Sequence, residues 1–440
     1  MPATDLNALI GPLGPFERPP VIVAAVSGGS DSLALGLLLA EWVAARGGRL
    51  HVLSVDHGLR PEARAEADSV ARRFDGLQHC AAEVLTWTGP KPATGLQRAA
   101  RAARYDLLTS WCRVRGILHL ALGHTADDQA ETVAMRRAHG STELGLAAMP
   151  AVQQLEGVRL LRPLLGCRRE ALRAFLRARG ETWLEDPSNE APRFERVRQR
   201  RAVAESGAVP VLIDEAERFG RARDAEDRAV ARLLIAAATL HSEAYATLER
   251  VAWQAAEDGL RRAALRRLLM AVGGRAYPPA PAAVEALTER ATLARSGIVG
   301  TLAGCVLAIR RGRIELCREA GDIRDRPKVA PGWSGLWDHR FLLSVADGAP
   351  SGDLDIRPLG AEGQRQAARN FGLSLKRHPV PAPARAALPA LWQGEQVLAQ
   401  PHLGLGSGLA ARPAPRHSAT TCGFTVAVRP PHTMYSSFLG

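Results

Sequence analysis

The residues with the clearest capacity for chemistry lie in one short segment, Ser27-Gly28-Gly29-Ser30-Asp31-Ser32. Adjacent glycines allow a tight turn and a close backbone approach to a ligand, because no Cβ intervenes. The amides at the start of a following helix carry partial positive charge and favour phosphate. Three serine hydroxyls can add hydrogen bonds. The segment is not a Walker A loop, since no Gly-Lys-Ser/Thr follows at the required spacing.

A second candidate group is acidic and comprises Asp127, Asp128 and Glu131. If a helix begins near Ala126, Asp127 and Glu131 lie four residues apart and share a face, and Asp128 and Glu131 are also neighbours. Paired carboxylates can hold Mg²⁺ together with triphosphate oxygens. They can equally anchor or deprotonate an attacking ammonium group. Both roles stay open, as does a solvated acidic first turn, which is favourable at any helix N-terminus.

Both groups follow predicted buried strands. Val21–Val26 is a short apolar run that ends at the Ser-Gly-Gly turn, and Ile117–Leu122 is a similar run that ends at Gly123. The same reasoning predicts strands at Leu50–Val55 and Cys80–Leu85, and helices at Asp31–Arg46, Pro61–Phe74 and Gln97–Trp111. Strands that alternate with helices of this length imply right-handed βαβ units and a parallel, doubly wound α/β sheet.

The carboxyl ends of parallel strands meet at one edge of a sheet, where ligands bind in open α/β folds. Asp56 and His57 end the second predicted strand. We therefore expect this pair, the glycine-rich segment and the acidic group to converge on one pocket. His57 and His124 are less specific, because lone histidines often only fix strand ends by hydrogen bonding.

The remainder of the chain has a different character. The pattern from Val209 to Ala294 is helical and charged throughout. From Gly300 onward it indicates short strands and turns: a hairpin of Thr301–Ile309 and Arg313–Cys317, then strands at Phe341–Val345, Val397–Ala399 and Phe424–Val428. We predict three domains: a nucleotide-binding catalytic domain at 1–205, a helical domain at 206–295 and an α+β domain at 296–440.

Composition limits the classes of partner. Lys and Arg exceed Asp and Glu by 57 to 45, for a formal net charge of +12. This excess favours a polyanionic partner but does not choose between RNA, DNA and no such partner at all. Six cysteines without a C-x-x-C pair argue against a disulfide scaffold, a zinc site or an iron–sulfur site. The N-terminus has no signal-peptide pattern, and the longest apolar runs are too short to span a bilayer. We expect a cytoplasmic protein without a membrane partner.

The order of the motifs resembles that of the PP-loop ATP pyrophosphatases and, within them, the tRNA(Ile)-lysidine synthetases. The resemblance covers residues 20–200 and rests on six motifs: Ser27–Ser32, Val55-Asp-His-Gly-Leu-Arg60, Ala100-Arg-Ala-Ala-Arg-Tyr105, Gly123-His-Thr-Ala-Asp-Asp-Gln-Ala-Glu-Thr132, Arg162-Pro-Leu-Leu165 and Trp183-Leu-Glu-Asp-Pro-Ser-Asn189. One departure is Arg196-Val197, where the family usually has Arg-Asn. Val197 cannot make the hydrogen bonds of asparagine.

The resemblance implies a reaction in two steps. ATP adenylates the C2 carbonyl oxygen of the wobble cytidine in the CAU anticodon of tRNA(Ile), and pyrophosphate leaves. The ε-amino group of free L-lysine then displaces AMP. A homodimer stays open, because the sequence is silent on oligomeric state.

The resemblance also implies roles for particular residues. Ser27, Gly28, Gly29, Ser30, Asp31 and Ser32 would bind ATP, and Asp31 and Asp128 are candidates for Mg²⁺. Asp127, Asp128 and Glu131 would hold the lysine amine or the metal, and Arg101 or Arg104 would steady the adenylated intermediate. Contacts to tRNA are expected from Arg193, Arg196, Arg198 and Arg200.

Two rival interpretations keep the nucleotide site. A tRNA 2-thiolation enzyme shares the ATP chemistry but generally needs cysteines for sulfur transfer or an iron–sulfur cluster, and the missing C-x-x-C pairs argue against it. A non-catalytic nucleotide-binding module would leave Asp128 and Glu131 without a function.

Overall fold

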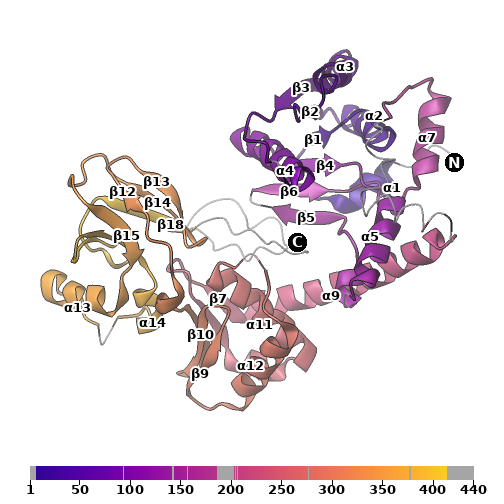
Figure 1. The fold of residues 1–440 in the computed structure, drawn as a ribbon. Helices are drawn as coiled ribbons and strands as arrows, with labels where there is room; N and C mark the ends of the chain where they lie inside the picture. Colours follow the sequence, from indigo (N-terminus) through magenta and orange to yellow (C-terminus); the bar gives the residue numbers. More distant parts are fainter. Residues whose placement is uncertain are drawn as a thin grey trace. The chain divides into compact units, whose positions relative to one another are not determined.

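The computed structural model describes residues 6–92, 94–140, 143–155, 157–185, 203, 205, 207–275, 277–375 and 378–413. These residues form two compact units, one reaching to Ala225 and the other starting at Glu226. Figure 1 shows the elements of each unit.

The N-terminal unit is built on a six-stranded sheet with the order β3-β2-β1-β4-β6-β5. All neighbouring strands run parallel except the β5–β6 hairpin, which is antiparallel. This arrangement confirms the predicted α/β class. The strands are β1 (Val21–Ala25), β2 (Arg49–Asp56), β3 (Cys80–Thr86), β4 (His119–Leu122), β5 (Val152–Leu155) and β6 (Val158–Leu161).

Helices cover both faces of this sheet (Figure 1). The four strands and three helices expected here from the sequence all form, with ends displaced by a few residues. The helices are α1 (Leu6–Ile10), α2 (Ser30–Ala44), α3 (Ala63–Asp75), α4 (Leu96–Val114), α5 (Ala126–Ala138), α6 (Glu143–Leu146), α7 (Arg169–Ala178) and α9 (Val209–Ala237), the last of which continues into the second unit.

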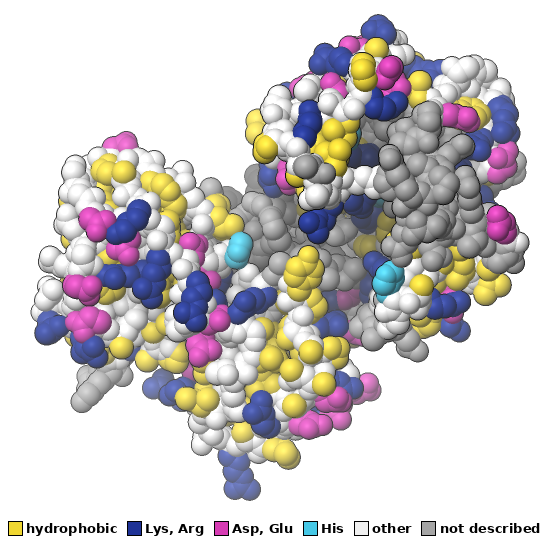
Figure 2. Space-filling view, viewed as in Figure 1, with side chains coloured by type: hydrophobic (Ala, Val, Ile, Leu, Met, Phe, Trp, Pro, Cys, Tyr) yellow, Lys and Arg dark blue, Asp and Glu magenta, His cyan; other side chains and the backbone are white. Residues whose placement is uncertain are grey.

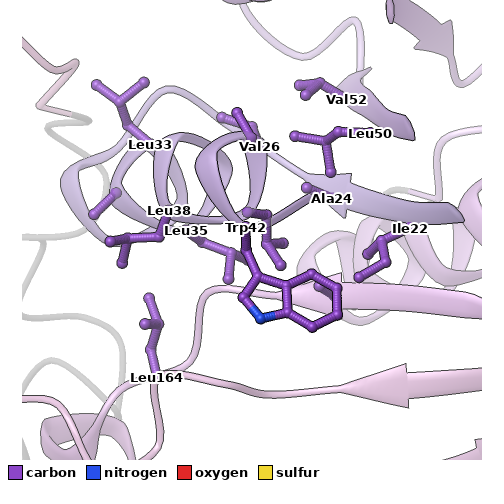
Figure 3. Packing of buried hydrophobic residues seen from close by; sticks show 14 of the residues in the cluster. Ile22, Ala24, Val26, Leu33, Leu35, Leu38, Trp42, Leu50, Val52 and Leu164 are labelled. Carbon is purple, nitrogen blue, oxygen red and sulfur yellow. The ribbon is translucent and has the colours of Figure 1, made fainter. Parts of the chain in front are cut away.

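The alternation of side chains along β1 explains the two cores. Ile22 and Ala24 face α2, whereas Val23 faces α4. Figure 3 shows Leu33, Leu35, Leu38 and Trp42 of α2 packed over β1 and β2. On the opposite face, Leu108 and Trp111 of α4 pack against the sheet. Each buried Leu side chain contributes about 1.5–3 kcal/mol of transfer free energy. Strand β1, which ends at the glycine-rich loop, is therefore held firmly between two well-packed layers.

The second unit begins with a five-stranded sheet of order β7-β8-β11-β10-β9, which packs with α10, α11 and α12. The prediction of helix throughout 209–294 was wrong at β7 and β8, because β8 pairs with β11, far along the sequence, and β7 pairs with β8. The elements are β7 (Ala238–Leu240), β8 (Ala246–Glu249), α10 (Arg250–Ala255), α11 (Asp258–Gly273), α12 (Pro281–Leu293), β9 (Gly297–Leu302), β10 (Cys305–Arg310) and β11 (Arg313–Arg318).

The predicted hairpin exists, but the strand predicted at Thr301–Ile309 is interrupted. A turn at Ala303 and Gly304, both with positive φ, separates β9 from β10. The domain limits at 205/206 and 295/296 stay predictions, and strands from both sides of 295/296 share this one sheet.

Two small antiparallel sheets complete the unit, with orders β12-β15-β16-β17 and β13-β14-β18. The strands expected at 341–345 and 397–399 are confirmed as β14 and β17, whereas Phe424–Val428 lies outside the described residues. The elements are β12 (Lys328–Val329), β13 (Ser334–Trp337), β14 (Phe341–Val345), β15 (Leu354–Pro358), α13 (Gly360–Phe371), α14 (Ala382–Ala386), β16 (Pro389–Gln393), β17 (Gln396–Ala399) and β18 (Leu409–Pro413).

Within the described ranges, no helix is both long enough and apolar enough to cross a membrane.

Candidate active site

The glycine-rich loop links β1 to α2 and is held by its own serines. Ser32 Oγ accepts a hydrogen bond from the backbone N of Ser27 at 3.1 Å and donates to the carbonyl of Gly29 at 3.1 Å. Ser27 Oγ lies 3.2 Å from Ser32 Oγ. The N-cap of α2 is Gly29, and no side chain makes a capping hydrogen bond there, although Asp31 lies in the first turn. This is the arrangement that binds phosphate at a helix N-terminus.

Gly28 is required by both conformation and space. Its φ is +88°, and a Cβ there would lie 2.5 Å from Leu184 Cδ1. The backbone N of Leu184 donates to the carbonyl of Gly28 at 2.9 Å, so the segment around residue 184 lies directly on the loop. Arg73 of α3 holds the same segment through the Thr182 carbonyl at 2.8 Å and an ion pair with Glu181. A cavity of about 300 Å³ lies beside the loop, lined by Gly28, Leu33, Ser69, Val70, Arg73, Thr182, Trp183 and Leu184.

The acidic group begins α5, where Thr125 and Asp128 form a capping box. The backbone N of Thr125 donates to Asp128 Oδ2 at 2.9 Å, and Thr125 Oγ1 accepts from the backbone N of Asp128 at 3.4 Å. Asp128 is 7% exposed and Glu131 is 2% exposed. These burials exclude a merely solvated acidic turn, because buried carboxylates must find charged or hydrogen-bonding partners.

Asp127 has a different partner from Asp128 and Glu131. Its Oδ2 accepts a hydrogen bond from the backbone N of Arg169 at 2.7 Å, and its Oδ1 lies 3.1 Å from Arg168 Nη2. Asp127 therefore anchors the start of α7.

The sequence did not single out the cation that joins the candidate carboxylates. Arg169 Nε lies 2.9 Å from Asp31 Oδ2, its Nη2 lies 3.2 Å from Asp128 Oδ1, and its Nη1 lies 3.9 Å from Glu131 Oε1. Burial would lower the pKa of Arg169, but the three carboxylates outweigh it and raise that pKa, so the guanidinium stays charged. A signal was present, because buried acidic side chains on two motifs require a counter-charge, but sequence spacing could not say which arginine supplies it.

The predicted arginines of α4 lie near the same strand ends. The pKa of His124 is lowered to about 3, mainly by burial. The positive charges of Arg162, Arg101 and Arg104 also lower it, and the negative charge of Asp128 opposes them. Burial and Arg104 likewise lower the pKa of His57. Both imidazoles are therefore neutral at pH 7. Arg101 donates from Nη2 to Tyr105 Oη at 3.2 Å, and burial lowers the pKa of Arg104.

Mg²⁺ is usually held by one or two carboxylates together with substrate phosphates. Asp31 and Asp128 converge on Arg169 and so offer hard oxygen ligands beside the phosphate loop. In the part of the chain that the structure describes, no group of three or more His, Cys, Asp or Glu side chains could hold a metal ion by itself.

The structure brings together most, but not all, of the predicted site. Asp31, Asp128 and Glu131 face the Arg169 guanidinium. Asp31 lies in the loop Ser27–Ser32, which is held by the hydrogen bond between Ser27 and Ser32. The expected tRNA contacts, Arg193, Arg196, Arg198 and Arg200, lie outside the described residues, as does Val197.

Comparison with known proteins extends these observations. The PP-loop domain family matches residues 3–206. A tRNA(Ile)-lysidine synthase from Ruegeria pomeroyi is 38% identical over 412 residues, which cover 90% of this chain and 91% of that protein. One from Rhizobium meliloti is 40% identical over 360 residues, covering 78% of this chain and 77% of its own. Among solved structures, a U34-tRNA thiolase from Methanococcus maripaludis covers 49% of this chain and 78% of its own, with 17% identity and a TM-score of 0.42.

Proposed function

Because the chain belongs to the tRNA(Ile)-lysidine synthase family, we propose that it joins free L-lysine to the wobble cytidine of tRNA(Ile) with a CAU anticodon, with ATP as the activating substrate. The observation that carries the proposal is the convergence of an uncapped phosphate loop with the buried carboxylates of α5 at one edge of a parallel sheet. We expect this action in the cytoplasm, where tRNA, ATP and lysine occur together.

The first step makes a leaving group. The cytidine C2 carbonyl oxygen attacks the α-phosphorus of ATP, an O–P bond forms, the bond to the β-phosphate oxygen breaks, and pyrophosphate departs. The amides and hydroxyls of Ser27–Ser32 would hold the triphosphate, and Asp31 and Asp128 would contact the Mg²⁺ of MgATP. Arg101 or Arg104 would stabilise the charge on the adenylated intermediate, since fixed cations act strongly where charge develops in a water-poor site.

The second step replaces AMP by lysine. The lysine ammonium must lose a proton before its nitrogen can attack C2, after which the C2–O bond breaks and AMP leaves. Asp128 and Glu131 are suited to hold the ammonium and to accept that proton, because both are buried and turned towards one point. Asp127 supports this site by fixing α7. The neutral His57 and His124 add no positive charge that would repel the ammonium.

Recognition of tRNA would draw on the positive charge of the whole chain. The formal net charge is +12, and Figure 2 shows Lys and Arg side chains spread over the visible face of both units among Asp and Glu. Phosphate contacts of this kind position a nucleic acid but do not read its sequence. We keep Arg193, Arg196, Arg198 and Arg200 as the proposed tRNA contacts. A homodimer stays open, and sedimentation with and without tRNA distinguishes it from a monomer.

The test is ATP-dependent incorporation of labelled lysine into tRNA(Ile) with a CAU anticodon, with methionine tRNA of the same anticodon as the control. We expect label on the isoleucine tRNA alone and loss of label in Asp128→Asn and Glu131→Gln. Pyrophosphate release without lysine transfer would keep the ATP chemistry but contradict the proposed acceptor. If folded protein binds the tRNA but shows neither lysine transfer nor pyrophosphate release, the proposal that the chain is an enzyme is contradicted.

A further inference from the structure

Arg169 occupies an unusual place in the proposed site, because one guanidinium faces carboxylates from two separate motifs. Asp31 belongs to the phosphate loop and α2, whereas Asp128 and Glu131 belong to α5. The Arg169 side chain is 20% exposed, and the acidic side chains that it faces are less exposed still. Such a cluster differs from a surface ion pair, since solvent screens it little.

The backbone of Arg169 is fixed by rigid elements on both sides. Its N–H donates to Asp127 at 2.7 Å, and the Cys167 carbonyl just before it accepts from the backbone N of Ala126 at 2.9 Å. Further along α7, Leu172 and Leu176 are buried in the core that α7 shares with α2. The guanidinium is therefore aimed by the packing of α7 on α2 and α5.

The charges around the cluster leave Arg169 with a distinct role. One guanidinium faces three carboxylates at this point, one at the start of α2 and two on α5. Other charged or titratable groups lie nearby. Asp127 on α5 pairs with Arg168 on α7, and His124 after β4 interacts electrostatically with Arg162 after β6 and with Arg101 and Arg104 on α4. The Arg169 guanidinium reaches both Asp31 and the α5 carboxylates, and so joins the two motifs.

We propose that Arg169 is a positioning residue that holds Asp31, Asp128 and Glu131 together, so that one cation couples the ATP subsite to the lysine subsite. The assignment rests on the proposed function for the identity of the two subsites. Without the guanidinium, the like charges of Asp31 and the α5 carboxylates would repel one another, Asp31 would move away from α5, and the three carboxylates would no longer be held together where Mg²⁺ and an ammonium group would bind. Arg169 acts through these carboxylates and takes no part in bond making.

The test compares Arg169→Met, which keeps a long apolar stem, with Arg169→Lys, which keeps the charge. Binding of MgATP to the purified chain is measured by equilibrium dialysis, and the KM for lysine is measured in the transfer assay. We expect Arg169→Met to weaken MgATP binding and to raise the lysine KM, each by about tenfold, and Arg169→Lys to recover most of both. Arg177→Met is the matched control, because Arg177 lies on the same helix, is exposed and pairs with the exposed Glu170.

A second variant separates charge from mere folding. In the Arg169→Met background, Glu131→Gln removes one of the repelling carboxylates, so MgATP binding should recover by about threefold although lysine transfer stays low. Because Arg169→Met leaves buried carboxylates without this cation, thermal unfolding is measured for every variant, and binding is compared at a temperature at which all the chains are folded. The Kd for tRNA should match that of the parent chain.

Unchanged MgATP binding and unchanged lysine KM in Arg169→Met would overturn the proposal. A further loss of MgATP binding when Glu131→Gln is added to Arg169→Met would also overturn it. The same holds if Arg169→Lys recovers neither MgATP binding nor the lysine KM relative to Arg169→Met. A parent chain that binds MgATP and shows the Arg169 effects, yet transfers no lysine, would contradict the proposed function and leave the coupling of Asp31 to α5 intact.

Discussion

Two buried clusters of arginine and carboxylate side chains, one in each unit, differ in their balance of charge. In the N-terminal unit Arg169 faces Asp31, Asp128 and Glu131. In the second unit, arginines outnumber the aspartates they pair with: Arg318 pairs with Asp322 and Asp338, Arg340 pairs with Asp338, and Arg275 pairs with Asp322.

On the proposed function, the difference separates the catalytic site from a structural link. The second cluster saturates its carboxylates, and its arginines also donate to carbonyls, Arg318 to Gly304 and Arg340 to Ala387, both at 2.8 Å. It therefore joins β11 to the β13–β14 turn. In the first cluster, three carboxylates share one guanidinium beside a phosphate loop. Burial of charge alone would not have distinguished them.

The largest expected effect tests the structural cluster. Asp338→Asn keeps a residue that tolerates the φ of +46° but removes the charge facing Arg318 and Arg340, the latter 1% exposed. Breaking a buried pair strands a charge, so we expect a loss on the order of 3 kcal/mol in the free energy of unfolding. Urea unfolding measures it. A loss of lysine transfer without a loss of stability would remove the distinction between the two clusters.

The counterpart in the site is Glu131→Gln. The change keeps the shape of a 2%-exposed side chain and removes its charge and its capacity to accept a proton. We expect lysine transfer to fall by about 100-fold, because a positioned acid–base group contributes on that scale. The free energy of unfolding should fall far less than in Asp338→Asn. A variant that unfolds as readily as Asp338→Asn would make Glu131 structural.

A smaller effect is expected at the phosphate loop. Gly28→Ala would force a side chain into a φ of +88° and against Leu184, whereas Gly47→Ala at the end of α2 has a similar φ of +61° with no atom within 4 Å. Both changes should cost about 1 kcal/mol of strain. Only Gly28→Ala should also lower ATP-dependent pyrophosphate release. Equal loss of pyrophosphate release in the two variants would show that the contact with Leu184 is unimportant.

A further effect, visible only as a dependence on pH, concerns a buried group that stays neutral. Burial lowers the pKa of His119 on β4 to about 4, against the opposing effect of Glu17 3.0 Å away. The unfolded chain binds a proton below about pH 6.5, whereas the folded chain does not until about pH 4. The free energy of unfolding should therefore fall as pH falls through this window, by at most about 1.4 kcal/mol per pH unit. His119→Gln should have a shallower slope in urea unfolding at pH 4 to 7, and an unchanged slope would contradict the neutral state.

The sequence by itself determined the sheet and the phosphate loop. Short apolar runs bounded by Pro and Gly define strands, and Gly28 with its neighbouring serines needs only local backbone geometry to form a phosphate-binding turn. Because strand ends of a parallel sheet share an edge, the convergence of the loop and the acidic group could also be predicted. The strand at Ala238–Leu240 could not be predicted. It pairs with β8, and β8 in turn pairs with β11, whose residues come much later in the chain.

Only the tertiary structure decided the partners of the charges. Asp127 and Asp128 are adjacent in sequence, yet one anchors the backbone of α7 and the other faces the Arg169 guanidinium. Helical spacing says which side chains share a face, but it does not say which distant cation reaches them. Arg169 lies 138 residues from Asp31, and the packing of α7 against α2 brings the two together. Long-range electrostatic partners follow from packing, which local sequence patterns do not encode.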